Sequence, residues 1–288
     1  MTDQNQATEP PIAERPPTPA KAKAQKLTSL RRDPNGWLIL LLGLGAPIAY
    51  IIAAGGSGLG LWGWQAGLAA LPWIILTALA ALVLAVGVII LHRRKGRKTR
   101  WPLLGLGVLA TLGFLGYLLP YGVAYITLPA IHDITTDLAD PPQFTALTLR
   151  PDNWDNIPGV DDGDMRGMNP RQRWATEHQD AYPDIRSVRI DQPVAVVIEK
   201  AKRLAEDRGW DIASVDPAAG NLEATDTVSL FRLKNDVVIR ARAAENGAAS
   251  IIDMRSVSRV GVHDLGVNAK RVRQFLSDLS GTTTAASQ

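Results

Sequence analysis

The residues best suited to chemistry lie in a short stretch from Arg255 to Asn268, which holds two arginines, two serines and a glycine-containing turn. Arg255 and Arg259 lie four positions apart at the expected end of a strand, and Asn268 opens the expected last helix. Guanidinium groups and the backbone amides of a helix start bind carboxylate and phosphate groups. The stretch is therefore a candidate anion-binding site. Alternatively, its arginines pair with Asp253, Asp264 or the upstream acidic stretch and stabilise a strand-to-helix corner.

A second candidate stretch begins at His132, directly after a long apolar segment. Its polar residues either cap or strap the domain that follows, or form half of a cleft that Arg255 and Arg259 complete. A nucleophile assembled from Ser256 or Ser258 with His263 and Asp264 lacks the G-x-S-x-G turn, and adjacent residues seldom serve as base and orienting group. The candidate ligand- or partner-binding residues are Arg255, Ser256, Ser258, Arg259, Asp264, Asn268, Arg271, His132, Asp133 and Asp137.

Three further motifs point to cofactors or metals only weakly. The sequence has no cysteine and four widely separated histidines, so it shows no zinc-ligand spacing. Carboxylates between Asp152 and Asp164 could bind calcium, but their spacing fits no EF-hand and equally suits a solvated loop. Gly58 to Gly63 matches G-x-G-x-x-G, a nucleotide pattern that requires a preceding strand, whereas here it joins two apolar segments. We therefore predict no cofactor and no metal.

Long uncharged segments indicate a membrane protein. Charged residues are absent from Pro34 to His92 and again from Trp101 to Ile131. One crossing needs roughly 20 apolar residues, so the first segment is long enough for two. We expect spans at about 37–54, 68–91 and 101–128, the last with a kink or interfacial turn at Pro120. The chain then divides into a disordered basic tail (1–35), a membrane region (36–129), a folded domain (130–282) and a short disordered tail (283–288).

The distribution of charge predicts the orientation of these spans. Six bases occur before Gly36 and six more from Arg93 to Arg100, whereas the chain after Ile131 carries 19 bases against 24 acids. Basic segments that flank spans face the cytoplasm, so the two basic segments on either side of the first two spans both lie inside. The third span then places the domain outside. In a bacterium this is a multi-pass inner-membrane protein with a periplasmic domain. The acidic domain leaves little basis for nucleic-acid binding.

Small residues within the spans predict close helix packing. Gly45, Ala49 and Ala53 recur at a spacing of four, as do Ala81 and Ala85. Such stripes let helices approach closely, either within one chain or between copies. No ionisable side chain lies inside a span, which argues against a transporter or proton relay.

The segment from Ile185 onward has the pattern of an α+β domain. Apolar residues at helical spacing from Val194 predict a helix that Asp191 caps, and alternating residues predict strands at 210–215, 222–228, 237–243 and 250–257. The last helix, 268–279, should bury Val272 and Leu279 while Arg271 faces water. We expect an antiparallel sheet packed with two helices, in the order strand, helix, four strands, helix. The sheet's polar face is either solvated or covered by the irregular stretch 141–182.

Several ordered motifs resemble the bacterial "domain of unknown function 1499" family. They lie at 132–137, 140–144, 182–185, 235–240 and 253–261, followed by Asp264, Gly266, Asn268 and Arg271. The resemblance covers about Pro129 to Leu279 and implies an envelope-associated domain without assigned catalytic residues.

The leading hypothesis is a non-enzymatic membrane protein whose outer domain binds an envelope protein, a lipid or another amphiphile. The alternatives are a cell-envelope hydrolase or lipid-processing enzyme, and a structural subunit of a membrane complex. The oligomeric state stays open.

Overall fold

The structure, a computed structural model, describes residues 33–99, 101–228 and 231–281. The predicted tail at 283–288 and nearly all of the tail at 1–35 lie outside the described residues. The chain forms two compact units. Among the described residues, the first comprises those up to Ile48 together with those from Trp73 to Phe114, and the second comprises Ala49–Pro72 and those from Leu115 onward.

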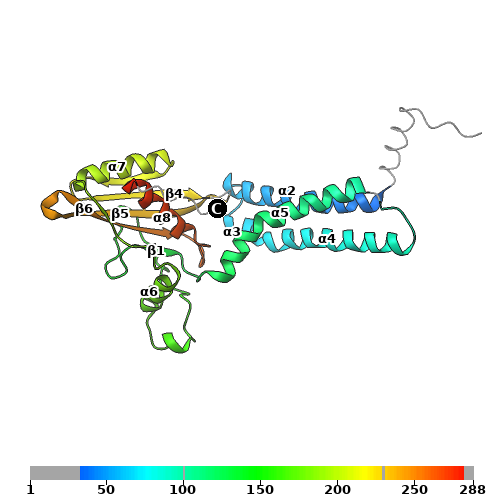
Figure 1. The fold of residues 1–288 in the computed structure, drawn as a ribbon, viewed down its shortest axis with the longest axis horizontal. Coiled ribbons are helices and arrows are strands. Elements are labelled where there is room, and N and C mark those ends of the chain that lie inside the picture. The colour runs from blue at the N-terminus through cyan, green and yellow to red at the C-terminus, as the bar shows by residue number, and fades with distance from the viewer. Residues whose placement is uncertain (1–32, 100, 229–230, 282–288) are drawn as a thin grey trace, which may run out of the picture. The chain divides into compact units, whose positions relative to one another are not determined.

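Long apolar helices occur where the uncharged segments predict them. They are α2 (Pro34–Gly58), α4 (Leu71–Arg94) and α5 (Trp101–Thr127), and a short helix α3 (Trp64–Ala69) precedes α4 (Figure 1). Among the described residues, three helical segments are long and apolar enough to cross a membrane, and they start at Pro34, Trp64 and Trp101. Helix α5 runs on through Pro120, and the G-x-G-x-x-G pattern follows helix α2 rather than a strand.

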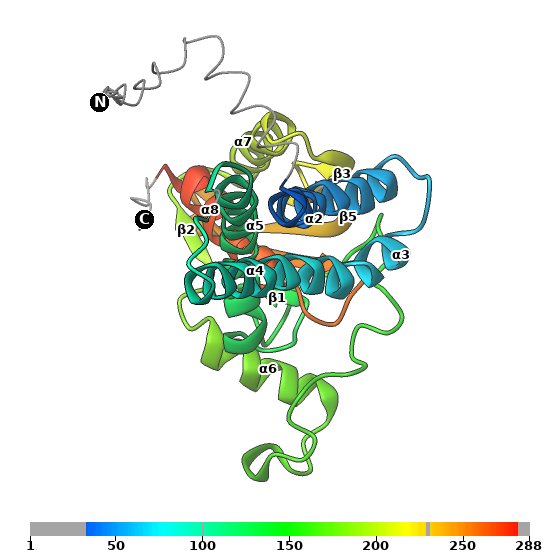
Figure 2. The same ribbon diagram turned by 90° about the vertical axis from the view of Figure 1, so that its right-hand side faces the viewer.

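Close packing in the first unit depends on glycines other than the predicted one. A Cβ added to Gly43 of α2 would lie 2.3 Å from the carbonyl oxygen of Gly107 in α5, so the two backbones touch there. Ala81 and Ala85 of α4 are buried, as the small-residue pattern predicts. A Cβ added to Gly45 would meet nothing within 4 Å, so Gly45 does not bring two helices of this chain together. The helices α2, α4 and α5 can be followed together in Figure 2.

The second unit is built on an antiparallel sheet, which confirms the predicted α+β class. Its strand order is β1-β6-β5-β4-β3, and β2 also pairs with β6. Strands β1 and β2 therefore share one edge of β6, with Asp133 opposite Val257 and Val188 opposite Ile252. The strands are β1 (Asp133–Thr135), β2 (Val188–Ile190), β3 (Asp211–Asp216), β4 (Asn221–Val228), β5 (Leu233–Ala244) and β6 (Ala249–Ser258).

Two amphipathic helices cover one face of this sheet. Helix α7 (Val194–Asp207) packs on β3, β4 and β5, and α8 (Val267–Ser280) packs on β6, β1 and β2. The order from β2 to α8 is the predicted strand, helix, four strands and helix. The core between the layers includes Ile239, Met254 and Phe275, all fully buried. The expected cap of α7 is wrong, because Pro193 occupies the N-cap and exposed Asp191 pairs with Arg189 instead.

A helix interrupts the stretch 141–182, which the sequence suggested was irregular. Helix α6 (Pro170–Ala181) begins with a capping box between Asn169 and Gln172, preceded by a single 3-10 turn, η1 (Gly163–Met165). Trp174 Nε1 donates to the Asp133 carbonyl oxygen at 2.7 Å, and His178 Nε2 accepts from the Thr135 amide at 3.2 Å. These bonds attach α6 to β1.

Candidate functional site

The polar face of the sheet is covered rather than open. The register places Glu223, Arg240, Asp253 and Arg255 on the face opposite α7 and α8, because their neighbours on each strand face the core. Residues 136–147, here called the strap, leave β1 and bond to this face at several points. The strap overlaps only the beginning of the stretch 141–182. Residues 136–140 contact Arg240, and residues 142–147, which belong to that stretch, contact Arg255 and Glu223.

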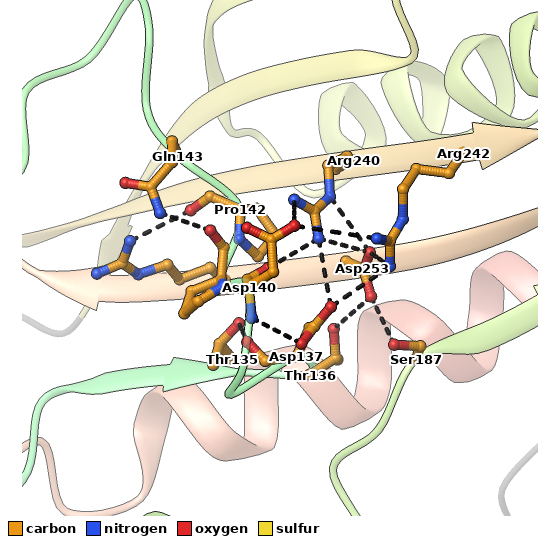
Figure 3. A network of polar contacts seen from close by, with 12 residues as sticks. Thr135, Thr136, Asp137, Asp140, Pro142, Gln143, Ser187, Arg240, Arg242 and Asp253 are labelled. Carbon is orange, nitrogen blue, oxygen red and sulfur yellow. Dashed lines mark hydrogen bonds and ion pairs between the residues drawn. The ribbon is translucent and has the colours of Figure 1, made fainter. Parts of the chain in front are cut away.

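Figure 3 shows that Asp253 pairs with two arginines, Arg240 and Arg242, beneath the strap. Its carboxylate is fully buried and lies 3.0 Å from Arg240 Nη2 and 2.8 Å from Arg242 Nη2. The Ser187 hydroxyl also donates to Asp253 at 2.5 Å. Arg240 donates onward to Asp140 at 2.9 Å, and both arginines contact Asp137, a predicted site residue. Both guanidinium groups are thus satisfied by carboxylates of the domain itself.

A second carboxylate, Glu223, pins the other end of the strap. It is fully buried and accepts hydrogen bonds from the amides of Thr145 at 2.6 Å, Ala146 at 3.1 Å and Leu147 at 2.7 Å. Burial by itself would raise the pKa of Glu223. The hydrogen bonds from the strap outweigh it and hold that pKa below its usual range. Glu223 is therefore charged, and its hydrogen bonds attach the strap to the sheet.

The two predicted stretches meet in an ion pair with almost no exposed surface. Arg255 donates from Nε to Asp133 Oδ1 at 2.9 Å and from Nη2 to Asp133 Oδ2 at 2.7 Å. Asp133 also accepts from Asn153 Nδ2 at 2.8 Å, and Arg255 Nη1 donates to the Pro142 carbonyl oxygen at 3.2 Å. Asp133 and Arg255, which were expected to lie on opposite sides of a cleft, are therefore in direct contact on adjacent strands.

Arg259 likewise has an acidic partner, Asp236, whose oxygens lie 2.8 Å from its nitrogens. Its Nη2 also donates to the Thr225 hydroxyl at 3.0 Å. Both arginines thus pair with acidic residues, but with Asp133 and Asp236 rather than with Asp253 or Asp264.

The predicted serines belong to a buried network around Asn268. The Ser256 hydroxyl donates to Asn268 Oδ1 at 2.8 Å, while Asn268 Nδ2 donates to Ser258 Oγ at 2.8 Å and to the His132 carbonyl oxygen at 3.0 Å. Arg271 Nη1 joins at 3.0 Å from Ser256 Oγ. Arg271 is buried, which lowers its pKa despite the opposing effect of Asp226, so the expectation that it faces water is wrong.

The corner that leads into α8 is organised by Asp264. Its carboxylate accepts from the Gly266 amide at 2.8 Å and from the Asn268 amide at 2.9 Å, and burial raises its pKa. His263 accepts from the Leu265 amide at Nδ1, and its Nε2 donates to the Leu128 carbonyl oxygen at 3.1 Å. His132 Nδ1 donates to the Val262 carbonyl oxygen at 3.3 Å. These histidines hold the corner against the segment that leaves α5.

A cavity of about 240 Å³ lies within the second unit, and we call it the junction cavity. Its walls are apolar and aromatic and come from the end of α2, from residues 68–71, from α5 and from β5. Its polar lining residues include two of the predicted site residues, Ser258 and Asp264. The walls include Tyr50, Leu68, Tyr117, Tyr121, Phe231 and Leu233, and the polar lining consists of Asn235, Ser258, His263 and Asp264 beside the tyrosines.

Asn235 lines the junction cavity and was not among the candidate residues. Its side chain is 3% exposed, and its Nδ2 has no hydrogen-bond partner among the described residues. Asn235 stands at the start of β5 opposite Ser258, in a motif that resembled the family but contained no recognisable ligand pattern. No local sequence signal could have shown that Tyr50 of α2 and Tyr117 of α5 would line the same cavity as Asn235.

Residues 133–279 match the model of a family described as a protein of unknown function, DUF1499. The chain belongs to the DUF1499 family. No curated protein and no solved structure matches the chain. The matched residues run from the start of β1 almost to the end of α8, so the DUF1499 domain contains the sheet, the strap and the Asn268 network. Helices α2 to α5 lie outside the match.

The carboxylates between Asp152 and Asp164 of this DUF1499 protein do not form a metal-binding cluster. Among the described residues, no group of three or more histidine, aspartate or glutamate side chains lies close enough together to hold a metal ion. Asp152 instead pairs with Arg150 at 2.5 Å, and this arginine lowers the pKa of Asp152 to about 2. The Asn153 side chain donates a hydrogen bond to Asp133.

Proposed function

We propose that this DUF1499 protein is a non-enzymatic membrane protein that binds an amphiphilic ligand in the junction cavity. The observation that carries the proposal is the make-up of that cavity, which combines leucine and aromatic walls with a few polar groups. Ligand pockets typically have this composition, since apolar contact supplies affinity and a small number of polar groups set orientation. An amphiphile presents the same two kinds of surface.

The position of the walls supports a ligand that arrives from a bilayer. Tyr117 and Tyr121 belong to α5, one of the candidate spans, and Tyr50 belongs to α2. Tyrosine is enriched where a span meets the headgroup region, because its ring is apolar and its hydroxyl is polar. A cavity bordered by such residues is accessible to molecules dissolved in the membrane.

The predicted site residues divide into two roles under this proposal. Ser258 and Asp264 line the cavity, and their side chains accept hydrogen bonds from within the domain. The others hold the domain together: Arg255 with Asp133, Arg259 with Asp236, and Ser256 with Asn268 and Arg271. His132 and Asp137 position the segments that enter and leave β1.

We further propose that the DUF1499 domain lies outside the cytoplasm, which in a bacterium is the periplasm. The support is the charge pattern, in which the basic segments flank an even number of spans and an odd number precedes the domain. Alkaline phosphatase fused after residue 288 should be active in cells, whereas a fluorescent protein exported unfolded should stay dark. The reverse pattern would place the domain in the cytoplasm.

Photolabelling tests the binding proposal directly. The full-length protein in phosphatidylcholine nanodiscs is irradiated with a single-chain alkyl diazirine, and labelled peptides are identified by mass spectrometry. We expect labelling of domain peptides at 231–235 and 258–267, which unlabelled chains compete away. Leu233→Trp should fill the cavity and suppress this labelling, while Val196→Trp on exposed α7 should leave it unchanged. Labelling confined to the apolar faces of α2, α4 and α5 would refute the proposal.

A further inference from the structure

The polar residues that line the junction cavity differ in whether their side chains already have hydrogen-bond partners. Asp264 already accepts two backbone amides, and both ring nitrogens of His263 have backbone partners. Ser258 Oγ accepts from Asn268 Nδ2. Asn235 Nδ2 is different, because it is a buried donor without a partner among the described residues. A ligand oxygen that accepts from this amide would remove an unfavourable burial.

The charges around the cavity disfavour an ionic head. The described lining residues include one acid, Asp264, and neither lysine nor arginine. An anionic head would therefore enter without a counter-charge and close to a carboxyl group. A quaternary ammonium head would offer no acceptor to Asn235, and the Asp264 oxygens are turned to the start of α8.

The size of the cavity limits the apolar part of the ligand. A volume of about 240 Å³ lies below the roughly 300–1,000 Å³ of pockets that enclose drug-sized ligands. One hydrocarbon chain or part of one fits such a space, whereas the two chains of a phospholipid do not.

We propose that the junction cavity takes a single-chain, uncharged amphiphile whose hydroxyl or carbonyl oxygen accepts a hydrogen bond from Asn235 Nδ2. This inference rests on the proposed function and narrows it to a ligand class. The same chemistry occurs in straight-chain alcohols and acylglycerols and in isoprenoid alcohols. The chain type is distinguished by experiment.

The test uses competition against the alkyl diazirine in full-length protein in phosphatidylcholine nanodiscs. The competitors are dodecanol, monolauroylglycerol, farnesol, dodecyl phosphate, dodecyltrimethylammonium and dodecane, each compared at its measured concentration in the bilayer. We expect dodecanol and monolauroylglycerol to compete about tenfold better than the charged heads and dodecane. If farnesol competes as well as dodecanol, the cavity accepts both isoprenoid and straight chains. If farnesol competes much less well, the cavity accepts straight chains.

Two variants assign the selectivity to Asn235. Asn235→Leu keeps the apolar volume and removes the donor, so the preference for dodecanol over dodecane should fall about tenfold. Asn235→Met, whose side chain also lacks a donor, should lose the same preference. Competition by dodecane reports whether the cavity is still folded in each variant. Equal competition by all heads in the wild type would overturn this inference and leave the proposed function standing, whereas unlabelled domain peptides would overturn the proposed function itself.

Discussion

Replacing Asp133 by alanine should destabilise the DUF1499 domain more than any surface substitution. Asp133 and Arg255 are 1% and 2% exposed, and they are joined by two hydrogen bonds. Among the described residues, the substitution would leave the Arg255 guanidinium with the Pro142 carbonyl as its hydrogen-bond partner, and Asn153 Nδ2 would lose its acceptor. The cost arises from a buried charge that has lost its counter-charge.

The magnitude follows from this geometry. Removing one partner of a buried pair costs about 3–5 kcal/mol, because the other charge stays desolvated. Replacing both partners by apolar residues, as in Asp133→Leu with Arg255→Met, should restore most of that loss. The matched control is Asp184→Ala, which breaks an ion pair with Arg273 whose side chains are 55% and 42% exposed. Such a pair contributes about 0–1 kcal/mol.

Urea unfolding of the full-length protein in a non-ionic detergent measures these differences, with near-UV circular dichroism reporting on the domain's aromatic core. With a slope of about 2 kcal/mol per molar urea, Asp133→Ala should lower the midpoint by about 2 M. Asp184→Ala should lower it by less than about 0.5 M. A loss for Asp133→Ala no larger than for the control, or a double variant as unstable as Asp133→Ala, would refute the reasoning.

Three further predictions concern other parts of the molecule. Glu223→Ala removes the acceptor for the strap amides, so limited proteolysis between 143 and 149 should become faster, whereas Glu177→Ala on α6 should not change it. Burial lowers the pKa of His178 to about 4, below the usual 6.5, so the unfolded state binds the extra proton and stability should fall by up to about 3 kcal/mol as the pH drops from about 6.5 to about 4. His178→Gln, which keeps an acceptor for Thr135, should flatten the pH dependence of the urea midpoint, and an unchanged slope would count against this assignment. Gly43→Ala should lower the thermal stability of the detergent-solubilised protein because the added Cβ meets the Gly107 backbone, whereas Gly45→Ala, which meets nothing, should maintain or raise it.

The elements of this fold were predictable where side-chain periodicity is local. Alternating residues predicted strands at 237–243 and 250–257, which the structure forms as β5 and β6, with Asn246 between them in a left-handed conformation. Helix α7 follows from its apolar stripe. Helix α6 was missed because Trp174 is its only large apolar residue, although Asn169, Pro170 and Gln172 form a recognisable helix start.

The candidate site was less predictable because its partners are distant in sequence. Strand β1 brings Asp133 into contact with Arg255 across 122 positions of the chain. Their burial could not be predicted, because the strap that covers them has no periodic pattern. Arg271 shows the same difficulty, since a charged residue on an amphipathic helix normally faces water unless an acid such as Asp226 meets it inside.

The shared edge of β6 determines where the DUF1499 domain can be separated from its membrane region. Strand β1 pairs with one half of that edge and β2 with the other, and the Thr136 amide donates to the Met254 carbonyl oxygen between them. A fragment that begins after Thr136 would present the unsatisfied backbone groups of half a central strand, which favours self-association. A soluble fragment for crystallography should therefore begin before Ile131 and retain the residues that emerge directly from α5.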